Sequence, residues 1–158
     1  MFRPEEIFQA EIESLKEELI QKYDDLGMRA TGNWANKLTS FVDISVGKYV
    51  AKIIGLDYTE QLVQGREPGG MPPVQNLVEW IEAKPITPWE NMTIESMAWA
   101  IAKKIAREGT KYFKQGGTDL IEAVITPERI KKIINAVGKL MVNNFKLEIN
   151  EDLQRIGQ

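Results

Sequence analysis

The spacing of hydrophobic residues predicts three long amphipathic helices. Hydrophobic side chains recur every three to four positions over residues 4–26, 94–108 and 127–146, which is the period of a helix with one buried face. A glycine follows each of the first two segments, where it suits a helix end. Thr126 and Pro127 open the third segment, because a hydroxyl caps the first backbone N–H groups and proline fits the first helical position.

Between the first and second of these helices the pattern changes to alternation. Val42, Ile44 and Val46 alternate with polar residues, as expected of a strand with one buried face. Gly47 and the lysine after it can form a two-residue turn, and a run rich in valine and isoleucine follows. The sequence therefore predicts an antiparallel hairpin over residues 40–57.

A stretch rich in glycine and proline follows the hairpin and is expected to form a loop region over residues 58–73. The residues that prevent a regular element there are Gly65, Pro68, Gly69, Gly70, Pro72 and Pro73. A short helix over residues 73–84 is predicted next, with Trp80 near the edge of its apolar stripe and Pro85 at its end. Residues 119–125 fit either a strand or a short helix.

Together these elements predict an α+β fold, with the long N-terminal helix and two further main helices packed on a small antiparallel sheet. At 158 residues, with 43% hydrophobic and 27% charged residues, the chain is expected to form a single domain over residues 1–158. No window approaches the roughly 18 apolar residues needed to span a bilayer, so no membrane association is expected.

The composition excludes several kinds of active site. The chain has no cysteine and no histidine, which rules out thiolate nucleophiles, disulfides, a histidine general base and zinc sites built from these residues. Neighbouring carboxylates such as Glu5 and Glu6 are adjacent along a helix and do not converge on one substrate. The glycines around Arg66 lack the lysine and the spacing of nucleotide-binding loops. We therefore expect no catalytic residues, no cofactor and no metal, although a small enzyme or inhibitor acting through carboxylates alone stays an alternative.

Negative charge gathers on the first predicted helix, although the net charge of the chain is only −3. Eight acids and two lysines lie between Glu5 and Asp25. Such a run is usually a solvated helix face. The other interpretation is a docking surface for a basic partner.

Positive charge gathers on residues 103–114, where five basic residues stand against one acid and two aromatic residues are interleaved. Basic residues at the end of a helix interact favourably with its dipole, so plain solvated surface is one interpretation. A second is a surface for an acidic neighbour, with Lys103, Lys104 and Arg107 as its candidate residues. A third is a nucleic-acid-binding module that combines phosphate contacts with base stacking. If the acidic and basic surfaces face opposite directions, identical copies can join head to tail into a ring.

An ordered set of short motifs runs from residue 58 to about residue 117. It consists of Tyr58, Gly65-Arg66, Pro68-Gly69-Gly70, Pro72-Pro73, Leu77 through Trp80 to Lys84, and AWAIAKKIAREGT at residues 98–110. This order resembles the tail-completion, or neck, proteins of tailed bacteriophages. In that family a Gly-Arg turn and a glycine–proline loop precede a tryptophan helix and an alanine-rich helix ending in an Arg-x-Gly-Thr-like turn. The chain departs from the family at Lys84-Pro85, where many members have Lys-Gly.

This resemblance implies a structural virion protein and not an enzyme. Copies would form a ring, of six or twelve, between the portal or connector and the tail, with a lumen in which DNA can be contacted without sequence specificity. The protein would be assembled in the host cytoplasm and reside in the neck or tail. Arg66, Pro68 and Pro72 are expected in the contacts of the glycine–proline bend, and Trp80 as packing for it or as core. The alternative function is nucleic-acid binding through residues 103–114.

Overall fold

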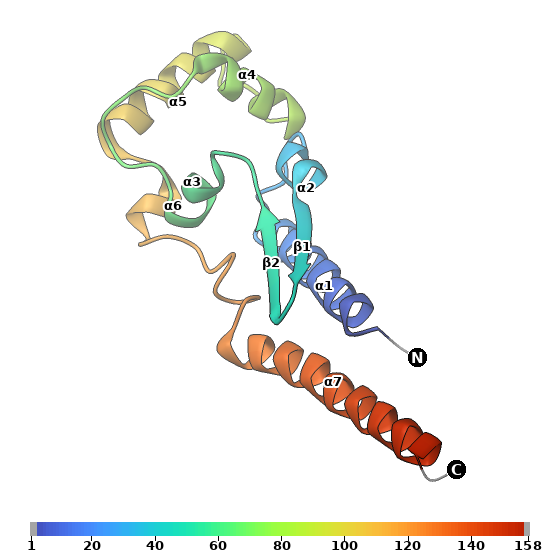
Figure 1. Cartoon of the computed structure of the whole chain (residues 1–158). Helices are drawn as coiled ribbons and strands as arrows, with labels where there is room; N and C mark the ends of the chain where they lie inside the picture. Colours follow the sequence, from blue (N-terminus) through green and yellow to red (C-terminus); the bar gives the residue numbers. More distant parts are fainter. Residues whose placement is uncertain (1–2, 157–158) are drawn as a thin grey trace. The chain divides into compact units, whose positions relative to one another are not determined.

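The structure is a computed structural model, and it describes residues 3–156 of the chain. Its elements in chain order are α1 (Pro4–Asp25), α2 (Asn33–Lys37), β1 (Thr39–Ser45), β2 (Lys48–Ile54), α3 (Thr59–Gln64), α4 (Val74–Ala83), α5 (Ile94–Glu108), α6 (Lys111–Lys114) and α7 (Pro127–Ile156) (Figure 1). A long N-terminal helix, further helices and a two-stranded antiparallel sheet make this an α+β fold, which confirms the predicted fold class. None of the helices in the described part is long and apolar enough to cross a membrane.

The chain divides into two compact units, where its length predicted one domain over residues 1–158. The first unit contains the described residues up to Leu19, the hairpin Thr39–Ile54 and the residues from Glu122 onward. The second contains Ile20–Leu38 and Gly55–Ile121. The boundary between Leu19 and Ile20 falls inside α1. Hydrophobic periodicity could not predict this division, because it marks which face of a helix is buried but not which neighbour covers it.

In the first unit, α1 and α7 bury apolar side chains with the hairpin. Ile12 and Leu15 of α1 form a buried cluster with Ile133 of α7. The partly buried hydrophobic residues packed against this cluster are Phe8, Val42, Ala51, Ile53 and Val124. The strands pair from Thr39 opposite Ile54 to Ser45 opposite Lys48. The hairpin therefore covers 39–54, so it begins one residue before the predicted range of 40–57 and ends three residues before the end of that range.

The hairpin turn differs by one residue from the prediction. Because Ser45 pairs with Lys48, the two turn residues are Val46 and Gly47 rather than Gly47 and Lys48. Gly47 has φ +74°, a backbone conformation that glycine adopts without a steric penalty. The side chain of Val46 is fully exposed at this turn.

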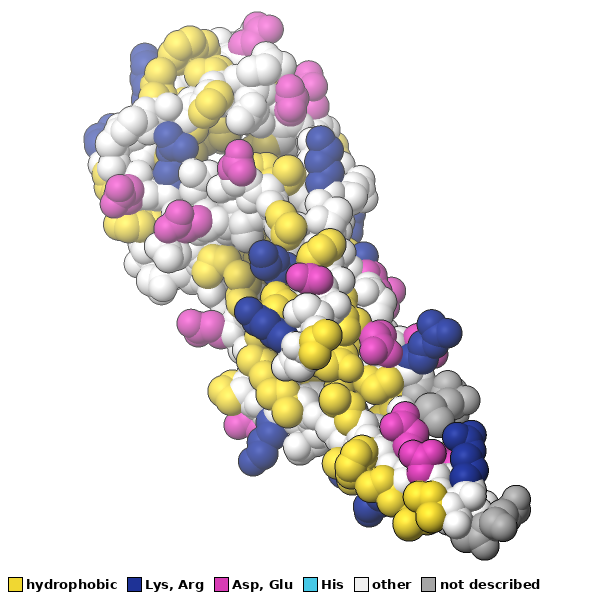
Figure 2. All heavy atoms as spheres, in the orientation of Figure 1, with side chains coloured by type: hydrophobic (Ala, Val, Ile, Leu, Met, Phe, Trp, Pro, Cys, Tyr) yellow, Lys and Arg dark blue, Asp and Glu magenta, His cyan; other side chains and the backbone are white. Residues whose placement is uncertain are grey.

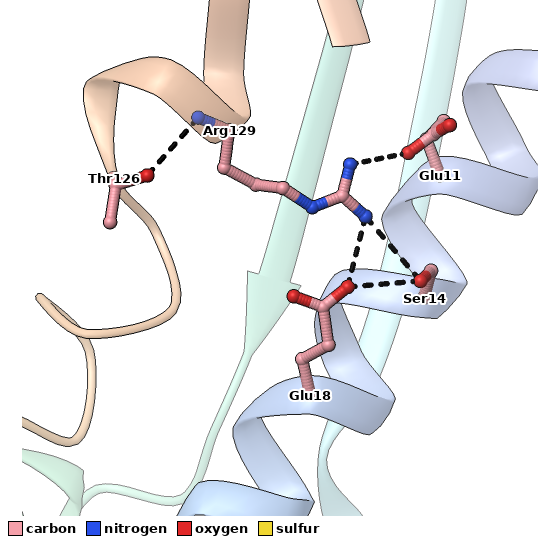
Figure 3. A network of polar contacts seen from close by, with 5 residues as sticks. All are labelled: Glu11, Ser14, Glu18, Thr126 and Arg129. Atoms are coloured by element: carbon pink, nitrogen blue, oxygen red, sulfur yellow. Dashed lines mark hydrogen bonds and ion pairs between the residues drawn. The ribbon is translucent and has the colours of Figure 1, made fainter. Parts of the chain in front are cut away.

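A single arginine ties the start of α7 to α1 within the first unit (Figure 3). The guanidinium of Arg129 donates hydrogen bonds to Glu11 Oε2 at 2.6 Å and to Glu18 Oε1 at 2.9 Å, and its second nitrogen also lies 3.4 Å from Ser14 Oγ. Glu11 and Glu18 lie about two turns apart on the same face of α1, with Ser14 between them, so one fork-shaped cation can reach both carboxylates. The Arg129 side chain is only 17% exposed. The hydrogen bond from Arg129 is the main reason that the pKa of Glu18 is lowered.

The second unit has a core between α4 and α5. Ile81, Met97 and Ala98 form its buried cluster. The partly buried residues around them are Val74, Leu77, Val78, Trp80, Ile86, Ile94 and Ile101. The small side chains of α5 allow this close packing, since Ala98 and Ala102 are completely buried.

A tryptophan organises the other part of the second unit. Trp34 of α2 is almost completely buried, its ring centroid lies 4.8 Å from that of Tyr23, and its Nε1–H donates to Thr59 Oγ1 at 2.9 Å. A buried indole needs such an acceptor for its N–H group. The chain just after the hairpin lies against this hydrogen bond. A Cβ on Gly55 would be 2.5 Å from Thr59 Oγ1, so this position has no room for a side chain.

Several element bounds differ from the sequence-based expectations. The expected loop region 58–73 was wrong at its start, because Thr59–Gln64 forms α3 and the irregular part begins at Gly65. The helix predicted over 73–84 is α4, and the one predicted over 94–108 is α5 with the same bounds.

The C-terminal part of the chain is more helical than expected. The helix predicted over 127–146 continues to Ile156, so α7 has 30 residues. The segment 119–125 is neither strand nor helix but a series of turns. The short helices α2 and α6 were not predicted, since segments of four or five residues carry too little periodicity to be recognised.

The Arg129 contact predicts an acid-dependent contribution to stability. Because the pKa of Glu18 is lowered in the folded state, this contribution is complete above the unfolded pKa of about 4.3 and is lost as pH falls through the folded value. Arg129→Met should lower the free energy of unfolding at pH 7 by about 1 kcal/mol, a modest value because the Glu18 side chain is 41% exposed. The difference from the parent chain should shrink by pH 3 in denaturant titrations.

Arg155→Met is the matched control for this prediction. Arg155 lies on the same helix in a long, exposed pair with Asp152, with a nitrogen–oxygen distance of 3.5 Å. Its replacement should leave stability within about 0.5 kcal/mol at every pH. Equal effects of the two substitutions, or an Arg129→Met effect that grows below pH 4, would contradict the assignment.

Candidate interaction surfaces

The glycine–proline bend is locked to the end of α5 by backbone hydrogen bonds. The N–H of Arg66 donates to Thr110 Oγ1 at 2.9 Å, and the N–H of Thr110 donates to the carbonyl of Arg66 at 2.9 Å. A third bond runs from the N–H of Gly69 to the carbonyl of Ala106 at 2.8 Å. Two motifs of the phage-family resemblance, Gly65-Arg66 and Gly109-Thr110, therefore meet in space although Arg66 and Thr110 are 44 positions apart.

Both glycines of this contact are required by its geometry. Gly65 has φ +79° and ψ −178°, a combination that only glycine adopts readily, and a Cβ there would lie 2.1 Å from the backbone nitrogen of Phe113. Gly109 has φ +76°, and its Cβ would lie 2.8 Å from the carbonyl oxygen of Arg66. The two backbones touch where a side chain would stand.

Thr110 serves both sides of the contact. Its hydroxyl oxygen accepts from the Arg66 N–H and, as the N-cap of α6, also accepts from the N–H of Phe113 at 3.4 Å. The same residue therefore holds the bend and begins the next helix.

The tip of the bend remains exposed. Glu67, Pro68, Gly69 and Gly70 are all solvent-exposed, and Pro72 is half-buried. An open groove beside the tip is lined by Gln61, Gln64, Arg66, Glu67, Pro68 and Phe113. The bend thus combines a fixed base with an accessible tip.

The side chain of Arg66 is less free than the sequence suggested. Its Nη2 donates to the carbonyl of Gly70 at 3.2 Å, which closes the tip upon itself. Arg66 is half-buried and has no ion pair among the described residues. This hydrogen bond shows that Arg66 contributes to the shape of the bend.

Trp80 lies in the core of the second unit. It is partly buried against the cluster of Ile81, Met97 and Ala98. The sequence left open whether Trp80 is core or packing for the bend. Its place between α4 and α5 accounts for the residue without any partner protein.

The basic stretch 103–114 is partly neutralised within the chain. Glu108 accepts from Lys114 Nζ at 2.7 Å and from Arg107 Nη2 at 2.7 Å. These two cations, Lys114 first, lower the pKa of Glu108 to about 2. Lys103 and Lys104 are exposed without an ion pair in the described residues. One acid thus engages two of the five basic side chains in ion pairs, an arrangement that the sequence does not reveal.

Half of the acids of α1 are also ion-paired within the chain. Glu11 and Glu18 contact Arg129, as described above. Glu13 pairs with Lys16 at 2.6 Å and accepts from Ser40 of the hairpin, and the Lys16 hydrogen bond is the main reason that its pKa is lowered. Asp24 pairs with Arg29 at 2.6 Å. Four of the eight acids are thus ion-paired, whereas Glu5, Glu6, Glu17 and Asp25 have no ion pair among the described residues.

Among the described elements, α7 carries the most exposed large hydrophobic residues, and this exposure was not predicted from the sequence. Hydrophobic side chains gather along this helix in Figure 2. The exposed hydrophobic residues of α7 are Ile130, Ile134, Met141, Val142, Phe145, Leu147, Ile149, Leu153 and Ile156. The signal was present as hydrophobic residues at 149, 153 and 156, beyond the predicted helix end at 146.

The described residues offer no arrangement typical of a metal centre. No group of three or more acidic, histidine or cysteine side chains converges on one point in residues 3–156. The carboxylates that come together do so around arginine and lysine.

The close approach at Gly65 predicts a large cost for the smallest side chain. Gly65→Ala should lower the free energy of unfolding by about 3 kcal/mol or more, because it combines a left-handed φ with a clash against backbone. Gly116→Ala is the control, since Gly116 has nearly the same type of φ, +86°, but nothing within 4 Å of its Cβ. It should cost only about 1 kcal/mol. Equal losses in denaturant titrations would contradict the proposed contact.

Comparison with known proteins adds no family assignment. No protein-family model matches the chain, and no significant match was found among curated proteins or among solved structures.

Proposed function

We propose that this protein is a structural virion component of a tailed bacteriophage. It would form an oligomeric ring in the neck or upper tail that joins the portal or connector to the tail. The observation that carries the proposal is the reciprocal hydrogen bonding between Arg66 and Thr110. It unites the two most distinctive motifs of the family resemblance in one exposed bend.

A rigid, exposed bend suits a contact between subunits. Residues fixed before binding lose less conformational entropy when a neighbour docks. The three backbone bonds fix the base of the bend, while Pro68 and the two glycines after it stay accessible. Head-to-tail contacts between such bends and another surface of the next copy would close into a ring.

The charge distribution fits protein contacts better than nucleic-acid binding. Affinity for nucleic acid depends on the number of free cations that neutralise phosphates. Glu108 pairs with Arg107 and Lys114, so the basic stretch 103–114 keeps only part of its charge. Lys103 and Lys104 are available to an acidic neighbour or to DNA passing through the lumen of the ring.

Native mass spectrometry and negative-stain imaging of the purified chain test this proposal. The expected result is closed rings of six or twelve copies at high protein concentration. Gly70→Lys should abolish the rings without changing thermal stability, because Gly70 needs no left-handed φ and its Cβ would have nothing nearer than 4.0 Å. Gln75→Lys places the same charge on an exposed position of α4 and should leave the rings intact.

Two outcomes would count against the ring proposal. One is a chain that stays smaller than a ring at every concentration. The other is ring formation by Gly70→Lys at the concentration that the parent chain needs, since the tip of the bend would then lie outside the contact.

A further inference from the structure

The apolar face of α7 continues far beyond the part that packs inside the first unit. Ile133 and Val137 are buried, and Ile133 belongs to the cluster with α1. Along the helix next to them, Ile134 is 63%, Phe145 62% and Leu153 61% exposed. We call the exposed positions 134, 141, 145, 149, 153 and 156 the α7 stripe. Their spacing of three, four or seven residues keeps them on one side of the helix.

The α7 stripe also contains a glycine, Gly138, that no close contact among residues 3–156 requires. Gly138 lies in the middle of a helix, where glycine costs stability relative to alanine. A Cβ at Gly138 would meet nothing within 4 Å. The chain's own packing therefore gives no reason for the missing side chain, whereas close approach of a second helix would.

The charges of α7 are separated along its length. Residues 131–146 contain Lys131, Lys132, Lys139 and Lys146 and no acid. Residues 147–156 contain Glu148, Glu151 and Asp152 against Arg155 alone. Two parallel copies of this helix would set like charges side by side, whereas two antiparallel copies set the basic half beside the acidic half.

We propose that a second copy of this chain covers the α7 stripe, with the two α7 helices antiparallel about a two-fold axis near Phe145. A two-fold contact uses the same surface of both copies, so one stripe is sufficient for the pair. This register brings Ile134 level with Ile156 of the second copy and Met141 level with its Ile149. Leu153 comes within one residue of the level of Gly138, which places a large side chain opposite the smallest one.

The overlap of residues 134–156 is about 35 Å long, at 1.5 Å per residue. Specific interfaces typically use roughly 20 to 30 residues from each partner, and only part of this overlap faces the second helix. Pairing is therefore expected to depend on protein concentration. It goes beyond the proposed ring, whose contacts run head to tail and would involve the bend in the second unit.

Single cysteines test the orientation directly, because the chain has none of its own. Ile134→Cys and Ile156→Cys are made separately, one with a mass tag, and mixed before treatment with a short thiol cross-linker. Antiparallel pairing predicts that the mixed cross-link exceeds either self-link at least tenfold. In a parallel pair each cysteine would instead lie beside the same position of the second copy and form the self-link. The mixed link would then be out of reach, because positions 134 and 156 lie about 33 Å apart along the helix.

Asn143→Cys is the control for non-specific collisions. Asn143 is exposed and lies two residues before Phe145, about 160° around the helix from it. It should give no cross-link above that of a cysteine-free chain. Self-links of Ile134→Cys and Ile156→Cys that exceed the mixed link, or a mixed yield no higher than that of Asn143→Cys, would overturn the proposal.

Sedimentation equilibrium measures the strength of the same contact. Phe145→Asp should raise the dissociation constant of the pair at least tenfold, whereas Asn143→Asp should change it less than twofold. Both side chains are exposed, so the thermal unfolding of the dilute monomer should be unaffected.

A parent chain that stays monomeric and instead binds vesicles of anionic phospholipid would overturn the proposal and assign the stripe to a lipid surface. This test does not use ring imaging, so failure of the pairing proposal can be distinguished from failure of the ring proposal.

Discussion

The second unit depends on one backbone contact, in which two glycines allow segments from distant parts of the sequence to touch. Gly65 and Gly109 both adopt a left-handed φ, and neither has room for a Cβ. The reciprocal hydrogen bonds of Arg66 and Thr110 satisfy polar groups that the close approach would otherwise leave unpaired. The contact turns a segment rich in glycine, which is flexible in isolation, into a fixed support for the exposed tip around Pro68.

Electrostatics in this chain act mainly within the fold. Arg129 binds two carboxylates of α1, and Glu108 binds two cations near the end of α5. Runs of charge that a sequence presents as surfaces for partners thus become structural contacts once the chain is folded. The surfaces left for partners are of another kind: a short rigid tip and a long apolar helix face. Both suit a protein whose role is to join other subunits.

The sequence predicted the regular elements where local signals were strong. The bounds of α5 were predicted correctly because Thr93 caps its start and Gly109 ends it. The hairpin was recognised from alternation, but its turn was displaced by one residue, since register depends on the pairing of Ser45 with Lys48. The helix α3 was missed because six residues between glycine-rich and polar segments show no clear period.

The candidate surfaces were harder to predict. Gly65 and Gly109 were recognised as breaks in regular structure, but nothing local indicates that they meet. The α7 stripe was overlooked because hydrophobic residues predict burial, and here they are exposed along a helix that continues to Ile156. Ion pairs such as those of Arg129 depend on tertiary packing and leave no mark on the sequence.

The claim at the centre of this account is that the bend is already rigid in the free protein. Amide hydrogen exchange, resolved at the residues of the bend, tests it most directly. We expect the N–H groups of Arg66, Gly69 and Thr110 to exchange as slowly as those in the interior of α5, because Arg66 donates to Thr110 Oγ1, Gly69 donates to the carbonyl of Ala106, and Thr110 donates back to the carbonyl of Arg66. Exchange of these three amides at the rate of an unfolded chain, while α5 stays protected, would contradict it.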